Sequence, residues 1–334
     1  MNPQAPWNGK DTVGSVIDGR FEIGALLAET NMASIYKAFD RSTGEEVAIK
    51  IPLPDIESDI SCHQRFLREE QIVAQLDHPF ILKAVEPDRR KSRLYLATEL
   101  LTGETLGQRL AREGALPAGE ALRIAAAVCG ALAYLHANEV VHRDLKPDNI
   151  VLCSDGSLRI IDFGISRLAK ARRLTFSGIS PLLGTPEYMA PEQVKGKRGD
   201  HRSDLYSLGA ILYEMLTGVC PFSGETPYVV MNARVSGDPV ALRTVKPDID
   251  PCVEEIVLHA MARDPSQRHP SAEALKRELE DPTSVVPTGR CDRLVAPGAS
   301  RPGWQSLPLL ACLIIAQVAL VGFVVAFLML RSHH

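Results

Sequence analysis

The octet His-Arg-Asp-Leu-Lys-Pro-Asp-Asn at residues 142–149 constrains this 334-residue chain more than any other feature. An apolar segment with helical character, residues 120–138, precedes it, and two short strand-like runs, IVLC and LRIID, follow it. Asp-Phe-Gly at 162–164 comes directly after the second run. The two acidic motifs are one β-hairpin apart, so their carboxylates can face one site. A polar turn would explain the tripeptide His-Arg-Asp alone, but not the full octet between an apolar helix and two short strands.

The segments on either side of the octet differ in secondary structure. Residues 21–51 alternate or cluster apolar side chains as strands do, and RLYLATELL is a further strand. Residues 58–78 have an apolar helical face, and Pro79 ends it. Residues 204–217 are apolar on nearly every side, which is typical of a buried helix, and Gly218 can cap its end. A strand-rich part therefore precedes a larger helical part.

Composition and charge exclude several classes of protein. The formal net charge of −4 argues against a nucleic-acid-binding protein, which usually carries a basic excess. The seven cysteines are scattered without a CxxC pair or a Cys/His cluster, which argues against a zinc site and a disulfide framework. The N-terminal residues lack the pattern of a secretory signal, so we expect the bulk of the chain in the cytoplasm.

A second apolar segment, residues 307–330, predicts a membrane anchor. It carries no charge, and at about 1.5 Å per residue it forms a helix of roughly 36 Å, enough to cross a hydrocarbon core of about 30 Å. A buried core helix is the alternative, but it would have to dock through a loose linker without a polar face. Arg290, Arg293 and Arg301 precede the segment and Arg331 follows it, which favours a cytoplasmic location for the larger part.

Five parts are expected along the chain. They are a flexible leader (1–20), one folded domain (21–281), a juxtamembrane linker rich in Pro, Gly, Ser and Arg (282–306), the transmembrane helix (307–330) and a short tail (331–334). With one span and no outer domain, such a chain fits neither a transporter nor a receptor.

Two residues upstream of the octet suit the binding of a polyphosphate. Lys50 lies in the strand VAIK, and Glu69 lies in the helix that follows. Alone, Lys50 would be a solvated strand residue, and Glu69 would pair with Arg65 one turn away. Together they can form an ion pair that presents the ammonium to the α- and β-phosphates of a nucleotide.

The octet and the second acidic motif suit phosphoryl transfer, which needs neutralised phosphates, bound metal ions and an aligned acceptor hydroxyl. Asp144 would accept the proton of that hydroxyl or orient it. Lys146 would steady the γ-phosphate. Asn149 would bind one Mg²⁺, and Asp162 would be the main metal ligand, because Mg²⁺ prefers carboxylate oxygens together with phosphates.

A further motif, Gly-Thr-Pro-Glu-Tyr-Met-Ala-Pro-Glu, occupies residues 184–192. A buried Glu192 needs a cationic partner, and Arg268 is the candidate. VAIK, HRDLKPDN, DFG, APE, SDLYSLG and this late arginine together resemble the eukaryotic-like (Hanks-type) serine/threonine protein kinases of bacteria, over roughly residues 21–281.

The resemblance implies a two-lobed α+β protein kinase fold, with a small β-rich N-lobe and a large helical C-lobe. It implies ATP together with Mg²⁺ or Mn²⁺, and Lys146 within HRDLKPDN points to Ser and Thr of proteins as acceptors. Asp204 would anchor the octet from beneath.

The resemblance also assigns an adenine pocket. Glu99 and Leu101 fall at the hinge that binds adenine through its backbone, and Thr98 guards the inner pocket. The adenine ring would lie between the side chains of Ile35, Ala48 and Val151.

The chain departs from the resemblance at residues 28–35, where the family has the phosphate-binding loop GxGxxGxV. Ala28, Thr30 and Ala33 replace its glycines, and Glu29 adds negative charge. A forced left-handed residue costs roughly 1–2 kcal/mol, so we expect weaker ATP binding or slower turnover without loss of activity. Restoring the three glycines should lower the KM for ATP. A loop with another conformation at little cost is the alternative.

Arg143 and the segment after DFG suggest a phosphorylation switch. A phosphate on Thr175, Ser177 or Ser180 would pair with Arg143, helped by Arg172 or Arg173, and order the loop. Autophosphorylation within a homodimer would supply that phosphate. For each hydroxyl alone, an ordinary loop side chain is the alternative.

Two functions stay open at this point. The first is a membrane-tethered serine/threonine kinase of the inner membrane, with a single span and its kinase domain facing the cytoplasm. The second is a pseudokinase that acts as a membrane-bound scaffold or nucleotide sensor. The complete set of charged motif residues favours the first, and the loop without glycine favours the second.

Overall fold

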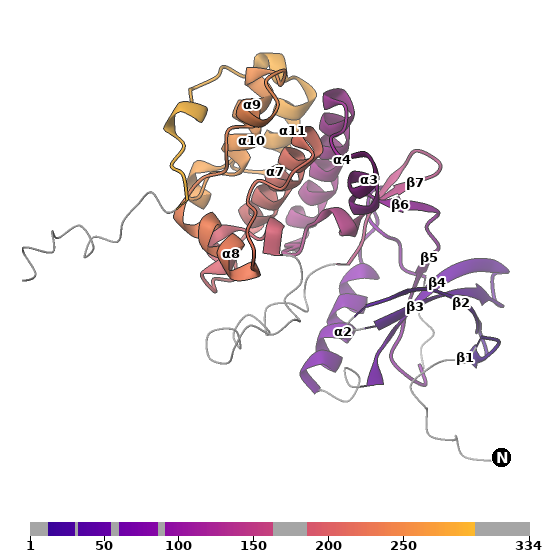
Figure 1. The fold of residues 1–334 in the computed structure, drawn as a ribbon. Coiled ribbons are helices and arrows are strands. Elements are labelled where there is room, and N and C mark those ends of the chain that lie inside the picture. The colour runs from indigo at the N-terminus through magenta and orange to yellow at the C-terminus, as the bar shows by residue number, and fades with distance from the viewer. Residues whose placement is uncertain (1–12, 31–32, 55–59, 86–90, 163–185, 298–334) are drawn as a thin grey trace, which may run out of the picture.

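The computed structural model describes residues 13–30, 33–54, 60–85, 91–162 and 186–297, apart from a few side chains in α2 and that of Pro186. This part forms a smaller β-rich N-lobe and a larger helical C-lobe (Figure 1). The predicted two-lobed α+β fold is therefore confirmed. The predicted transmembrane helix, 307–330, lies outside the described residues.

Five antiparallel strands form the sheet of the N-lobe, in the order β1-β2-β3-β4-β5. Their bounds are β1 (Val16–Ile17), β2 (Phe21–Glu29), β3 (Ala33–Asp40), β4 (Glu45–Pro52) and β5 (Leu96–Glu99). In β4 the apolar residues Val47, Ile49 and Ile51 are buried. Because side chains alternate along a strand, Ala48 and Lys50 point to the opposite face.

Helix α2 (Ile60–Val73) lies beside this sheet (Figure 1). Its Phe66 packs in a small apolar cluster with Leu94 and Leu96, the latter on β5. The helix ends at Val73, five residues before the predicted end at residue 78.

A second, three-stranded sheet begins the C-lobe, in the order β6-β7-β8. It consists of β6 (Gly103–Thr105), β7 (Ile150–Cys153) and β8 (Leu158–Ile160). The short helix η1 (Pro147–Asn149) leads from the octet into β7, and β8 ends two residues before Asp162. The predicted hairpin between the two acidic motifs is confirmed.

Helices α4 (Ala118–Ala137) and α7 (His201–Thr217) form the centre of the C-lobe. Gly218 ends α7 in the left-handed conformation (φ 77°), as predicted. Among the described residues, α4 has the length and apolar composition of a membrane span, but its buried face belongs to the core. The remaining helices of the lobe are α3 (Leu106–Glu113), η3 (Pro186–Tyr188), α6 (Pro191–Val194), α8 (Pro227–Ser236), α9 (Leu242–Val245), α10 (Pro251–Ala260), η4 (Pro265–Gln267) and α11 (Ala272–Glu280).

Residues 282–297, predicted as part of a linker, lie against the C-lobe. They contain η5 (Pro282–Ser284) and η6 (Cys291–Arg293), and their apolar side chains Val285, Cys291 and Leu294 pack on the main core. The backbone N–H of Asp238 donates to the backbone oxygen of Val295 (2.7 Å), and the N–H of Val295 donates to the side-chain carboxylate of Asp238 (2.9 Å). Short turns of this kind have no hydrophobic period, which is why composition alone indicated a linker.

Candidate functional site

A cavity of about 230 Å³ lies where the two lobes meet. Its walls come from strands β2 to β7, from α3 and from the end of α2. The cavity walls include all six residues assigned to the adenine pocket, namely Ile35, Ala48, Thr98, Glu99, Leu101 and Val151. Residues more than a hundred positions apart in the sequence thus share one largely apolar pocket.

Lys50 and Asp162 meet at the polar end of this cavity. The ammonium of Lys50, on β4, lies 2.5 Å from Oδ1 of Asp162. This positive charge holds the pKa of the Asp162 carboxyl below its ordinary value. Asp162 has φ of 53°, an uncommon conformation for a residue with a side chain. The contact joins the N-lobe to the C-lobe.

Asp204 holds the octet from beneath, as the resemblance implies. Its carboxylate is fully buried and accepts hydrogen bonds from the backbone N–H groups of His142 and Arg143, at 2.9 and 2.7 Å. Nε2 of His136 lies 2.8 Å from the same carboxylate. These bonds fix Arg143 at φ of 63°, a strained value that the loop keeps only because several bonds impose it.

Asn149 connects the octet to the strand that carries the second acidic motif. Its side-chain amide donates to the backbone oxygen of Asp144 (2.9 Å), and its own carbonyl accepts from the N–H of Ile161 (2.9 Å). Asn149 is buried, and Lys146 is half-buried just before η1. After Lys50, Lys146 also contributes to the lowered pKa of Asp162. Asp144, Lys146, Asn149 and Asp162 therefore lie close together.

In the predicted loop 28–35, Thr30 joins the paired ends of β2 and β3, and Asn31 and Met32 lie outside the described residues. The hydroxyl of Thr30 donates to the backbone oxygen of Ala33 and accepts from its N–H, at 2.9 and 3.0 Å. Ala28, Glu29, Thr30 and Ala33 all have negative φ, so the predicted left-handed penalty is wrong for these positions. Ala28 is exposed, and Leu27 lines the cavity instead, because the register of β2 shifts between Leu26 and Ala28.

Several predicted residues fall outside the described part of the chain. The side chain of Glu69 is one of them, so its ion pair with Lys50 stays a prediction. Phe163 and Gly164 of the second motif are others, as are the proposed phosphorylation sites Thr175, Ser177 and Ser180.

Three arginines concentrate positive charge beside the octet. Burial lowers the pKa of Arg143, and the charge of Arg198 lowers it further; the nearby carboxylate of Asp204 opposes this change, and Arg68 adds a smaller lowering. Nε of Arg143 has no hydrogen-bond partner within the described residues. Sequence reasoning named Arg143 but missed Arg68 and Arg198, because no motif links positions so far apart. The arrangement can hold an anion.

Glu192 and Arg268 form the predicted buried pair. Two nitrogens of Arg268 donate to the two carboxylate oxygens of Glu192, both at 2.7 Å, and Ser203 donates to the same carboxylate. Burial alone would raise the pKa of Glu192, but the hydrogen bonds and charge of Arg268 lower it. The prediction is confirmed.

Comparison with known proteins agrees with this geometry. A family profile described as "Protein kinase domain" matches residues 21–279. The chain is 36% identical over 277 residues to a probable serine/threonine-protein kinase of Streptomyces coelicolor, covering 82% of this chain and 41% of that protein. It is 34% identical over 268 residues to serine/threonine-protein kinase PrkC of Bacillus subtilis, covering 80% of this chain and 41% of PrkC. The chain thus spans less than half the length of these relatives.

Solved structures give the same result. The kinase domain of PknI from Mycobacterium tuberculosis superposes with a TM-score of 0.63 at 26% identity, covering 82% of this chain and 100% of that domain. A structure of Rad53 in complex with AMP-PNP has a TM-score of 0.62 at 25% identity, covering 77% of this chain and 64% of that chain.

Proposed function

Because the chain belongs to the protein kinase domain family, as a bacterial serine/threonine kinase of the Hanks type, we propose that it transfers the γ-phosphoryl group of ATP to serine or threonine hydroxyls of proteins. The observation that carries the proposal is the contact of Lys50 with Asp162 at the end of one apolar cavity. The similar Rad53 structure in complex with AMP-PNP supports a nucleotide as the ligand.

Each charged residue then has a distinct role. Lys50 would neutralise the α- and β-phosphates, with Glu69 as its partner. Asp144 would orient the acceptor hydroxyl and take its proton, and Lys146 would steady the γ-phosphate. The apolar walls of the cavity suit an adenine ring, with the backbone at Glu99 and Leu101 as its hydrogen-bonding edge.

Asn149 and Asp162 are the residues that would hold the metal ion. Both offer oxygen atoms, which Mg²⁺ and Mn²⁺ prefer. Because the amide nitrogen of Asn149 is bonded to the backbone of Asp144, its side-chain oxygen is the atom left for a cation. The bound ion would neutralise negative charge on the phosphates.

Transfer of labelled γ-phosphate to a generic basic protein tests the proposal. The Asp144→Asn variant should lose nearly all transfer. Asp155→Asn, the same substitution at an exposed turn between β7 and β8, should keep it. Equal activity of wild type and Asp144→Asn would refute the assigned role. No transfer by the wild type, with nucleotide binding intact, would instead support the pseudokinase, which the loop without glycine favours.

Autophosphorylation between two copies is part of the proposal. The positive charge of Arg143, Arg198 and Arg68 suits a phosphate on Thr175, Ser177 or Ser180. Mass spectrometry of ATP-treated protein should find phosphate within 175–180, at a rate that rises with protein concentration. An unmodified segment in fully active protein would contradict this.

Membrane tethering through residues 307–330 completes the proposed function. The chain should sediment with membranes and resist extraction by alkaline carbonate, whereas a chain ending at residue 306 should stay in the supernatant. Full release of the complete chain by carbonate would rule out a spanning helix.

A further inference from the structure

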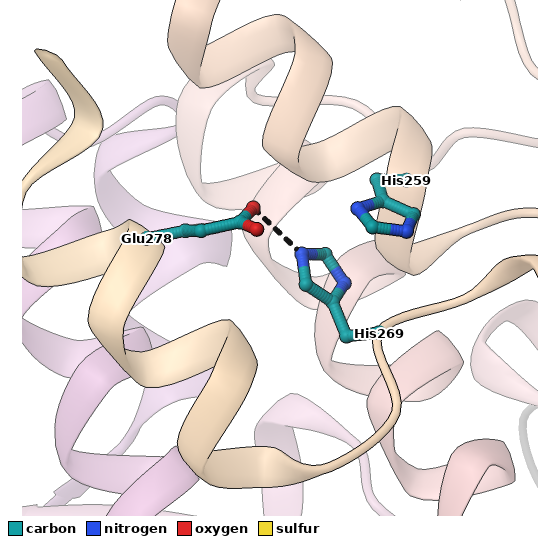
Figure 2. Close-up of side chains that lie close together, drawn as sticks. All are labelled: His259, His269 and Glu278. Carbon is teal, nitrogen blue, oxygen red and sulfur yellow. Dashed lines mark hydrogen bonds and ion pairs between the residues drawn. The ribbon is translucent and has the colours of Figure 1, made fainter. Parts of the chain in front are cut away.

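A second cluster of side chains lies in the C-lobe, apart from the nucleotide cavity. His259 comes from α10, His269 follows η4, and Glu278 comes from α11. Figure 2 shows the two imidazoles and the carboxylate turned toward one another from these three segments. They are separated by ten and nine positions in the sequence, so no short sequence motif indicates the cluster.

The donor atoms of this cluster lie close enough together for one metal ion to reach all three residues. Nε2 of His269 lies 2.8 Å from Oε2 of Glu278, and the two imidazole centroids are 3.8 Å apart. One donor atom from each residue lies within 4.8 Å of the others. Around a tetrahedral Zn²⁺ the ligand atoms are about 3.3–3.6 Å apart. Small side-chain rotations therefore suffice to bring all three donors onto one ion.

The surroundings combine a buried floor with an open mouth. The side chain of His269 is fully buried, and its Nδ1 has no partner within the described residues. His259 and Glu278 line an open cavity of about 570 Å³, whose other wall is formed by residues 284–290. The cavity gives an ion access from solvent and leaves room for water as a further ligand.

We propose that His259, His269 and Glu278 bind a divalent first-row transition metal, with Zn²⁺ as the foremost candidate. Two imidazoles and one carboxylate are the donor types that Zn²⁺ takes, whereas Mg²⁺ prefers oxygen donors alone. The positive charge of Arg290 near the cluster is offset by Glu255, whose carboxylate lies 3.0 Å from Nε of Arg290.

A bound ion would hold three segments of the C-lobe together. It would tie α10 and α11 to the loop that carries His269, the residue directly after Arg268. Residues 284–290 line the same cavity, with Thr288 and Arg290 bonded to Glu255 of α10. A bound ion would therefore also stabilise the packing of residues 284–290, the segment that leads toward residues 307–330.

Metal binding by the full chain in detergent tests the proposal, after removal of any affinity tag and of metal by EDTA. The chain ends in His333 and His334, which could bind metal by themselves, so all proteins carry His333→Ala and His334→Ala. Equilibrium dialysis against Zn²⁺ with elemental analysis should give one ion per chain. Co²⁺ should give the intense visible absorption of a tetrahedral site, and Zn²⁺ but not Mg²⁺ should raise the Tm.

Two variants remove ligands without touching the buried floor. His259→Gln and Glu278→Gln should each weaken Zn²⁺ binding at least about tenfold, since loss of even an outer-shell partner costs about 10–100-fold. His63→Gln, on α2 and outside the cluster, is the matched control and should bind as the parent does.

Three results would overturn the site. One is a parent protein that takes up no Zn²⁺ beyond the His259→Gln level. Another is unchanged binding in both ligand variants, and the third is an equal loss of binding in His63→Gln. Because binding and Tm are measured without ATP, each result is independent of kinase activity.

Discussion

The two sides of the nucleotide cavity are built in opposite ways. The C-lobe side, from the octet to Asp162, keeps every motif residue and is held by buried groups such as Asp204 and Asn149. The N-lobe side, the hairpin of β2 and β3, lacks every expected glycine and closes through the hydroxyl of Thr30.

The difference follows from what each side contributes. On the C-lobe side, the charges and oxygen atoms of side chains would bind the metal and the phosphates, so the residue types cannot change. On the N-lobe side, the backbone approaches the ligand, and more than one sequence can give the backbone the required shape. Loss of a side-chain motif would therefore be a stronger sign of lost activity than loss of the glycines. Four experiments test whether the two sides differ in this way.

The largest effect, a loss of stability, is expected at the buried ion pair of the C-lobe. Arg268→Leu leaves the buried carboxylate of Glu192 without its cation and should lower the free energy of unfolding by about 3–5 kcal/mol. Arg263→Leu removes a half-exposed pair with Asp238 and should cost about 1 kcal/mol or less. Urea denaturation measures both.

The double variant Glu192→Leu/Arg268→Leu checks the reason for that loss. It removes both charges and should recover part of the stability, because no unpaired charge remains buried. A double variant as unstable as Arg268→Leu would attribute the loss to packing rather than to charge.

A second experiment loosens the octet without removing a motif residue. Asp204→Asn removes the charge that holds the N–H groups of His142 and Arg143, and misplacement of catalytic groups costs about 100-fold in rate. We expect kcat to fall by that amount, with a smaller change in the KM for ATP. Asp200→Asn, at the N-cap of the same helix, keeps its capping bond and should leave kcat unchanged.

The sequence predicted both lobes and most of the C-lobe side of the cavity, because local sequence patterns indicate them. Apolar periods mark α4 and α7, and the short motifs order Lys50 and Asp162 along the chain. The pairing of Glu192 with Arg268 followed from one rule, that a buried charge needs a partner.

The remaining features depend on tertiary contacts that no local pattern encodes. The closure by Thr30 requires the exact register of β2 with β3, which a bulge shifts. The docking of residues 282–297 has no period, and the cluster of His259, His269 and Glu278 exists only once α10 and α11 are packed. The absence of a Cys/His motif therefore said nothing about this cluster.

A third experiment compares the base of the β2–β3 hairpin with its tip. Buried Asp40 accepts hydrogen bonds from Arg20, which hold its pKa well below the ordinary 3.8. This stabilisation is complete above pH 3.8 and is lost as the pH falls toward the lowered native pKa. Asp40→Asn should therefore cost about 1.5–3 kcal/mol at pH 7, and the gap to wild type should be about 1 kcal/mol smaller at pH 3.

Glu22→Gln is the control for this pH dependence. Its pair with Arg41 joins the same two strands but is about half exposed, so its gap to wild type should stay below about 1 kcal/mol at both pH values. A gap for Asp40→Asn that does not change with pH would show that the pair contributes by packing and not by charge.

The smallest effect is expected at the hairpin tip, where two expectations oppose each other. From the sequence alone, restoring glycine at positions 28, 30 and 33 should lower the KM for ATP. The structure predicts a rise, because Thr30→Gly removes the hydroxyl that closes the hairpin and adds backbone freedom. We expect about a two- to fivefold rise in KM, since each bond contributes only about 0.5–1.5 kcal/mol. Thr30→Ser keeps the hydroxyl and should match wild type, whereas a lower KM for Thr30→Gly would mean that this closure hinders the phosphates rather than shaping their site.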